Sequence, residues 1–201
     1  MLNIASILLA VALLLHPLSA ERVFAATACS GYSDVTTDDW YCEAVTNMQE
    51  QGVLSPMSQF NPAKTANRAE ALKVITEASG ISGIETAAPF FGISADAWFV
   101  NYFFTAYGQQ VIKSKNGSMN PEHPITKAEF LIIFMQLFEI EPAASSSCGI
   151  TGVARSDWLM TDQQTAYLCR AKELGIATKG FGDATMTRAV MMQVLYNAIS
   201  R

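Results

Sequence analysis

The chain has 201 residues, of which 50% are hydrophobic, so it is long enough to bury a sizeable core within a single domain. Its formal net charge is −5 at pH 7. This acidic balance argues against nucleic acid or an anionic membrane surface as the main partner, because both would repel it.

The N-terminal segment has the layout of a secretory signal. An unbroken apolar run covers residues 7–15, and small residues follow at Ser19-Ala20 and Ala25-Ala26. From Ile4 the apolar stretch is about twelve residues long, whereas a membrane span needs about 20. No Lys or Arg precedes the run, so the terminal amine alone supplies the positive charge. We therefore predict that residues 1–26 are an export signal, that the chain is secreted, and that it has no stable membrane span.

The remainder of the chain repeats one pattern at intervals of roughly 50–60 residues. Trp40 to Val53 is thirteen positions, and so is Trp98 to Val111. Matching internal spacing is typical of a repeated supersecondary unit whose copies share one core. The predicted units, called the first, second and third unit, cover residues 29–80, 88–141 and 148–201, and the third is the most divergent.

Each unit is expected to contain a short turn, a first helix, a connection with glycine, an Asn-Pro turn and a second helix. Gly52 falls where the C-terminus of a helix needs a left-handed residue. Gly175 and, about one turn early, Gly108 fall near the same point of the other units. Asn61-Pro62 and Asn120-Pro121 mark turns through which a helix cannot continue. The second helices are predicted at residues 68–79, 127–138 and 188–199.

Four cysteines lie in the first and third units. Each pair has one cysteine before the opening turn and one in or near the first helix. In an exported protein this arrangement predicts two disulfides, Cys29–Cys42 and Cys148–Cys169. Each closed loop would contribute on the order of 3 kcal/mol to stability. Zinc binding is the alternative interpretation, although the chain has no CxxC motif and no Cys/His cluster.

Helix capping explains most of the residues that open the second helices, but it does not explain the basic residue at the first helical position. Thr126-Lys127-Ala128-Glu129 fits a capping box, and Asn67-Arg68-Ala69-Glu70 fits the same box with Asn as the cap. In the third unit Thr187 keeps the cap, but Val190 replaces the Glu. The basic residue at the first helical position has no capping role, and a cation there opposes the helix dipole. Anion binding would explain this placement, and a solvated surface charge is the alternative.

These stretches resemble the S-layer homology (SLH) domain family over essentially the whole expected mature chain. The matching residues of the first unit are Tyr32-Ser33-Asp34-Val35, Trp40-Tyr41, Gly52-Val53-Leu54, Phe60-Asn61-Pro62 and Asn67-Arg68-Ala69-Glu70. Those of the second and third units are Ile125-Thr126-Lys127-Ala128-Glu129-Phe130 and Met186-Thr187-Arg188-Ala189. The resemblance implies a mainly α fold in which three helix-loop-helix repeats form a pseudo-threefold helical bundle, or spindle.

The resemblance also implies a function. Modules of this family are similar to non-covalent anchors that bind acidic, commonly pyruvylated, cell-wall polysaccharide at the cell surface. The basic residue of the helix-opening motif contacts the acidic sugar substituent in the family, and that role falls on Arg68, Lys127 and Arg188. We expect these side chains to face outward, so that a ligand carboxylate meets a cation and free backbone N–H groups at a helix start. Several such sites acting on one polymer would gain further from effective concentration.

The remaining candidate site residues come from the same pattern. Asp34 is the aspartate of the opening turn. Trp40 and Trp98 are candidate platforms for sugar rings, with burial in the core as the alternative for each. Lys127 cannot form the two-pronged carboxylate contact of an arginine, so its site is expected to be weaker. Extra residues follow Trp158, so the groove of the third unit is expected to be altered or absent.

No catalytic constellation is visible in the sequence. His123 is the single histidine outside the expected signal, and no second His, Cys or carboxylate pattern completes a metal site or a Ser/His/Asp arrangement. We therefore expect neither an enzyme nor a cofactor or metal. The alternative function is a structural or assembly protein of the cell surface that binds itself or another envelope protein. Anchors of this family usually carry another domain, and the sequence does not indicate what this chain would hold.

Overall fold

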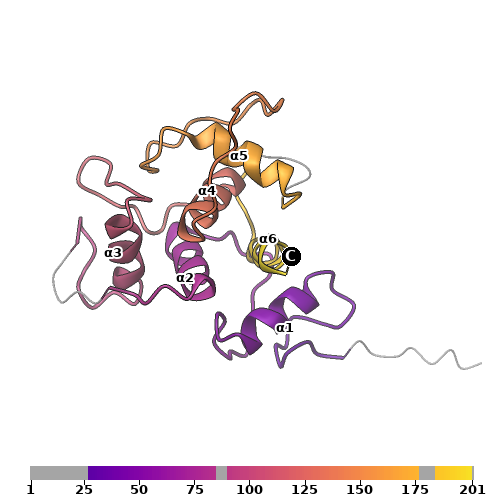
Figure 1. Ribbon diagram of the computed structural model, residues 1–201. Coiled ribbons are helices and arrows are strands. Elements are labelled where there is room, and N and C mark those ends of the chain that lie inside the picture. Colours follow the sequence, from indigo (N-terminus) through magenta and orange to yellow (C-terminus); the bar gives the residue numbers. More distant parts are fainter. Residues whose placement is uncertain (1–26, 85–89, 177–183, 201) are drawn as a thin grey trace, which may run out of the picture.

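The computed structural model describes residues 27–84, 90–176 and 184–200, and its regular secondary structure in these ranges is helical (Figure 1). The helices are α1 (Cys42–Glu50), α2 (Arg68–Ser79), α3 (Val100–Gly108), α4 (Lys127–Leu137), α5 (Gln164–Glu173) and α6 (Arg188–Ile199). Isolated β-bridges join some loops, but the described residues contain no strand. The predicted export signal at residues 1–26 lies outside the described residues, and no described helix is long and apolar enough to cross a membrane. The prediction of a mainly α fold is confirmed.

The second helices begin at the predicted residues because their caps are local. Asn67 Oδ1 accepts a hydrogen bond from the Glu70 N–H (2.9 Å), and the Glu70 carboxylate accepts one from the Asn67 N–H (3.2 Å). Thr126 and Glu129 form the same reciprocal box at the start of α4. Thr187 caps α6 through its hydroxyl alone. The one difference is that α4 ends at Leu137, one residue before the predicted position.

The units interlock around the second helices. The first helix of each unit packs on the second helix of the unit before it: α3 packs on α2, α5 on α4, and α1 on α6, which closes the circle. Figure 1 shows α2, α4 and α6 in the middle of the molecule, with α1, α3 and α5 around them. The first helix of each unit therefore makes its main helix–helix contact with a neighbouring unit.

A ring of backbone hydrogen bonds joins the three units at the starts of the second helices. The Ala66 N–H donates to the Met186 carbonyl (2.8 Å), the Met186 N–H to the Ile125 carbonyl (3.1 Å), and the Ile125 N–H to the Ala66 carbonyl (3.0 Å). Each of these residues lies two positions before the first residue of its helix. The ring brings the three helix starts together at one end of the bundle. Pseudo-threefold symmetry of the whole bundle stays a prediction.

The core lies among α2, α4 and α6. The side chains from Phe130 to Met135 of α4 are all buried, as the unbroken apolar sequence of this stretch requires. Ile75 of α2 and Leu195 of α6 are fully buried as well. Burying a large aliphatic side chain contributes about 1.5–3 kcal/mol, so this shared core is the main source of stability.

Left-handed residues end the connections, although not always where the sequence predicts them. Gly52 and Gly175 have φ values of +76° and +64°, as expected for residues that follow a helix C-terminus. Asn61 (φ +57°) makes the turn before its proline. Gly108, which lies early in the sequence pattern, is the last residue of α3, and Gln110 (φ +58°) adopts the left-handed conformation after that helix.

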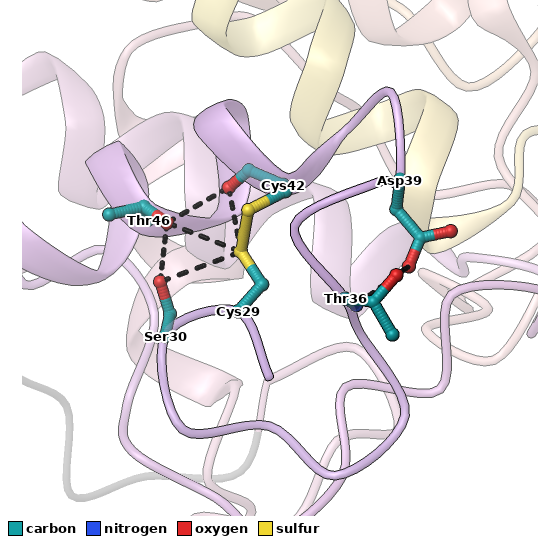
Figure 2. Close-up of a disulfide and its surroundings, with 6 residues drawn as sticks. All are labelled: Cys29, Ser30, Thr36, Asp39, Cys42 and Thr46. Atoms are coloured by element: carbon teal, nitrogen blue, oxygen red, sulfur yellow. Dashed lines mark hydrogen bonds between the residues drawn. A yellow bond between two sulfur atoms is a disulfide. The ribbon is translucent and has the colours of Figure 1, made fainter. Parts of the chain in front are cut away.

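Both predicted disulfides are present, which excludes the zinc alternative for these cysteines. Cys29–Cys42 ties the opening turn to the first residue of α1, and Cys148–Cys169 ties the loop after α4 to α5. Figure 2 shows the first bridge beside Thr46, whose hydroxyl donates to the Cys42 carbonyl (3.0 Å). It closes a short loop, which limits the conformational freedom of the unfolded chain.

The same figure shows how the turn before α1 is held. Asp39 Oδ2 accepts two hydrogen bonds from Thr36 (Figure 2): one from the backbone N–H at 2.7 Å and one from the hydroxyl at 3.0 Å. These hydrogen bonds, the backbone one first, lower the pKa of Asp39. Asp39 therefore stabilises the opening turn and does not cap α1 with its side chain.

Candidate functional site

The first helical N–H groups are not available to a ligand, which corrects the expectation of an anion site at a free helix start. The Arg68 N–H donates to the His123 carbonyl (3.0 Å), and the Arg188 N–H donates to the Lys64 carbonyl (2.9 Å). The Lys127 N–H points to the Ala184 carbonyl in the same way (3.4 Å). Recognition of an acidic ligand through these three N–H groups is therefore not supported.

Arg68 does not face outward, so that part of the prediction is wrong. The residue is 8% exposed, and its Nη2 donates to Glu129 Oε1 (3.3 Å), which belongs to the start of α4 and is itself 7% exposed. The guanidinium carbon lies 4.2 Å from the centre of the Trp158 ring. Burial lowers the pKa of Arg68, while the neighbouring carboxylate opposes this effect. Arg68 is thus part of the core between the first and second units.

Arg188 has the equivalent partners but remains half-buried. Its Nη1 donates to Glu70 Oε1 (2.9 Å) and its Nε to the Phe60 carbonyl (2.8 Å). The guanidinium carbon lies 5.1 Å from the Phe60 ring centre. Nη2 has no hydrogen-bond partner among the described residues, so one edge of the guanidinium can still donate.

Arg188 lines a groove that the units build together, called here the Arg188 groove. Its volume is about 290 Å³, near the lower end of the range for small-ligand sites, about 300–1,000 Å³. The polar lining consists of Tyr32, Ser55, Glu70, Lys73 and Arg188. The apolar lining consists of Leu54, Met57, Phe60, Val74, Trp98, Met191 and Met192. All three units contribute, since Trp98 comes from the second unit and Arg188 from the third.

The sequence interpretation missed a second cation in this groove. Lys73 lies on α2, and its Nζ donates to the Val53 carbonyl (2.8 Å). Burial lowers the pKa of Lys73, Glu77 opposes this, and the nearby charge of Arg188 adds to it. Two cations thus lie close enough to repel each other. The sequence does distinguish Lys73, because the corresponding positions of α4 and α6 hold the uncharged residues Ile132 and Gln193.

Glu70 offsets part of this charge. Its Oε1 accepts from Arg188 and from Lys64 Nζ, both at 2.9 Å, and its Oε2 accepts from the Asn67 N–H. The glutamate is therefore shared between helix capping and the Arg188 groove. Among the residues that line the groove, Arg188 and Lys73 are cations and Glu70 is the one carboxylate, so the formal charge of the lining is positive on an otherwise acidic chain.

Lys127 has a different environment. Arg68 and Arg188 each pair with the glutamate two residues after the first residue of the next second helix. For Lys127 the corresponding residue is Val190, so this pairing does not recur there. The side chain is half-buried, and burial lowers its pKa. Lys127 does not line the Arg188 groove. Its predicted role in ligand binding stays a prediction.

Asp34 holds two turns together and lies outside the lining of the Arg188 groove. Its carboxylate accepts from the Phe60 N–H and the Asn61 N–H, each at 2.7 Å. It thereby fixes the turn that carries Phe60, whose carbonyl and ring both contact Arg188. Asp34 would therefore influence a ligand by positioning this turn.

The two candidate platform tryptophans are on the surface, so burial in the core is excluded for both. Trp40 is 62% exposed and Trp98 is 58% exposed. Trp98 lines the Arg188 groove, whereas Trp40 does not. Trp158, which the sequence interpretation treated only as a marker of divergence, is the buried tryptophan, at 1%. Trp98 is therefore the tryptophan placed to stack on a ring bound beside Arg188.

The chemistry of the Arg188 groove suits an anion attached to an apolar-faced ring. Arg188 Nη2 and the Lys73 ammonium supply charged donors. Trp98 and Met57, which is 59% exposed, supply apolar surface at the mouth. Within the described residues no group of three or more His, Cys, Asp or Glu side chains is arranged to hold a metal ion.

Comparison with known proteins finds similar sequences among surface proteins. The S-layer homology domain model matches residues 31–72. The chain is 31% identical over 115 residues to the Surface-layer 125 kDa protein of Lysinibacillus sphaericus, an alignment that covers 54% of this chain and 10% of that protein. It is 23% identical over 176 residues to Exoglucanase XynX of Acetivibrio thermocellus, covering 82% of this chain and 16% of that protein. It is 21% identical over 118 residues to the S-layer protein of Bacillus thuringiensis subsp. finitimus, covering 58% and 14%.

The chain spans between a tenth and a sixth of the length of these relatives. What is shared is therefore one part of each of them. The part matched by the family model includes the opening turn, α1 and the first turns of α2. Residues 31–72 match the S-layer homology domain, and a longer stretch of the chain is similar to parts of S-layer proteins.

Proposed function

We propose that this chain, an anchoring module of the cell surface, binds acidic cell-wall polysaccharide non-covalently through the Arg188 groove. Its location at the cell surface follows from the S-layer homology domain and the S-layer relatives. The observation that supports the proposed ligand is the pair of cations, Arg188 and Lys73, in a groove with an exposed tryptophan at its mouth. A carboxylate carried on a sugar, such as a pyruvate ketal, would meet both cations while the ring packs on Trp98.

The expected affinity follows from these contacts. A hydrogen bond to a charged group contributes about 1.5–3 kcal/mol, so losing the contact from Arg188 should weaken binding about 10- to 100-fold. Lys73 should contribute less than Arg188, because part of its donor capacity goes to the Val53 carbonyl. Stacking on Trp98 adds apolar contact that does not depend on charge.

The test is retention of the purified, disulfide-intact chain by insoluble wall polysaccharide. The polymer is used intact and after mild acid has removed its ketal-linked carboxylates. We expect retention by the intact polymer, a strong loss after acid treatment, and a loss on intact polymer for Arg188→Gln and Lys73→Gln. Arg170→Gln is the matched control, because Arg170 is an exposed partner of Glu173 on α5 outside the groove. Equal retention of all variants on both polymers would refute the proposal.

A protein interface is the second candidate function. The observation that favours it is the exposure of Trp40 and Met57, two large apolar side chains on the surface. Light scattering coupled to size-exclusion chromatography distinguishes the two functions. A concentration-dependent oligomer that is lost in Trp40→Ser would favour assembly, and a monomer that still binds polymer would favour anchoring.

A further inference from the structure

Three tryptophans recur at nearly equal intervals, but one of them has changed place. Trp40, Trp98 and Trp158 are separated by 58 and 60 positions. α1 and α3 each begin two residues after their tryptophan, whereas α5 begins six residues after Trp158. Trp40 and Trp98 are exposed, and Trp158 is 1% exposed. The longer connection allows the chain to turn Trp158 inward.

The segment around Trp158 is held by the second unit. The Lys113 N–H donates to the Trp158 carbonyl, and the Met160 N–H donates to the Val111 carbonyl, each at 2.9 Å. These bonds flank an antiparallel bridge between Ile112 and Leu159. The inward position of Trp158 is therefore fixed by backbone pairing and not by its side chain alone.

Trp158 lies at the position that corresponds to the Arg188 groove in the next pair of units. In that groove, an arginine at one helix start pairs with the glutamate at the next, and Trp98 of the following unit stands at the mouth. Arg68 pairs with Glu129 in the same way, and Trp158 is the tryptophan of the following unit. Here, however, the indole ring lies directly on the guanidinium, with 4.2 Å between the Arg68 carbon and the ring centre.

The contact closes access to Arg68. A smaller cavity of about 200 Å³ lies nearby, but its lining includes Glu129 and Ser156 and not Arg68. The Ser156 hydroxyl donates to Glu129 Oε1 (2.7 Å), which further fixes the carboxylate. Arg68 Nε and Trp158 Nε1 are both buried without a hydrogen-bond partner among the described residues. Stacking and packing thus close this position, and the Nε donor of Arg68 remains unused.

We propose that Trp158 replaces the ligand at Arg68, so that of the two arginine positions only Arg188 can bind an acidic sugar. The identity of the ligand in this inference rests on the proposed function. The closure of Arg68 by Trp158 does not depend on it. The first unit therefore contributes Arg68 to the core and keeps its glutamate, Glu70, for the Arg188 groove.

Chemical modification of arginine tests the closure without a ligand. Phenylglyoxal is applied to the native, disulfide-intact chain, and the modified peptides are quantified over time by mass spectrometry. We expect Arg68 to react at least tenfold more slowly than both Arg188 and the exposed control Arg170. In Trp158→Ala, Arg68 should react within a few-fold of Arg188. Trp158→Leu, which retains more volume, serves if the alanine variant does not fold.

The outcomes separate the two proposals. Reaction of Arg68 as fast as Arg188 in the wild-type chain, or continued protection of Arg68 in a folded Trp158 variant, would overturn the closure. The methyl glycoside of a 4,6-pyruvylated hexose is then added as a probe. It should slow the modification of Arg188 alone in the wild type, and of both arginines in the Trp158 variant. If the probe does not slow Arg188, the proposed function fails while the slow reaction of Arg68 still supports the closure.

Discussion

Replacing Arg68 with alanine should destabilise the protein far more than the same change at Arg188. Arg68 and Glu129 are 8% and 7% exposed, so removing the guanidinium leaves a buried carboxylate with Ser156 as its remaining side-chain donor from another unit. Breaking a buried ion pair by removing one partner costs about 3–5 kcal/mol. For a chain of this size that loss corresponds to a decrease in melting temperature of roughly 6–20 °C.

Arg188→Ala should cost about 1–2 kcal/mol, because this pair is partly solvated. The side chains of Arg188 and Glu70 are 18% and 13% exposed, and Glu70 keeps its contacts with Lys64 and the Asn67 N–H. The assay is urea unfolding followed by circular dichroism, with the disulfides intact.

A compensating variant tests the physical reason. Arg68→Met combined with Glu129→Gln removes both charges, keeps the volume and leaves an acceptor for Ser156. It should recover most of the stability lost in Arg68→Ala, because replacing both partners of a buried pair is often neutral. The reasoning would be refuted if Arg68→Ala cost no more than Arg188→Ala, or if the double variant were less stable than Arg68→Ala.

Three further outcomes are expected. Replacing Cys148 and Cys169 with alanine should lower the free energy of unfolding by about 3 kcal/mol, measured by urea unfolding, and a loss below 1 kcal/mol would contradict the loop-closure explanation. Thr126→Ala should cost about 1 kcal/mol in the same assay, because it removes the acceptor for the Glu129 N–H, whereas Thr126→Ser should cost little. Burial, followed by the hydrogen bond to Glu77 (2.5 Å), raises the pKa of Tyr102 to about 12, so the folded state favours the neutral phenol. The stabilisation is complete below pH 10 and is lost as the pH rises towards 12. Absorbance titration at 295 nm should show a tyrosine ionising near pH 12 that is missing in Tyr102→Phe.

Local features could be predicted from the sequence almost to the residue. The starts of α2, α4 and α6 follow from side chains that bond to backbone groups three positions away, so no tertiary information is needed. The disulfides follow similarly, because each joins cysteines within one unit.

The environments of the cations could not be predicted in this way. The spacing inside a unit says nothing about which helix of another unit lies opposite, and each first helix packs on the preceding unit. For this reason Arg68 and Arg188 look equivalent in the sequence but differ in the structure, where Trp158 covers one and Trp98 leaves the other accessible. The missed cation, Lys73, could have been found by comparing the positions five residues after each helix start.

The circular packing has a consequence for how such domains are recognised. The family model matches residues 31–72, which supply Tyr32, Phe60 and Glu70 to the Arg188 groove. The arginine itself arrives on α6, which packs on α1, and the tryptophan at the mouth arrives from the segment before α3, which packs on α2. A single unit therefore contains the walls of the groove but neither its main cation nor its aromatic platform. Because the same Arg–Glu pairing joins neighbouring units and lines the groove, the proposed binding and the assembly of the bundle would depend on one set of side chains. A change in the segment before one first helix would thus close a binding position and still preserve the fold, as we propose for Trp158 at Arg68.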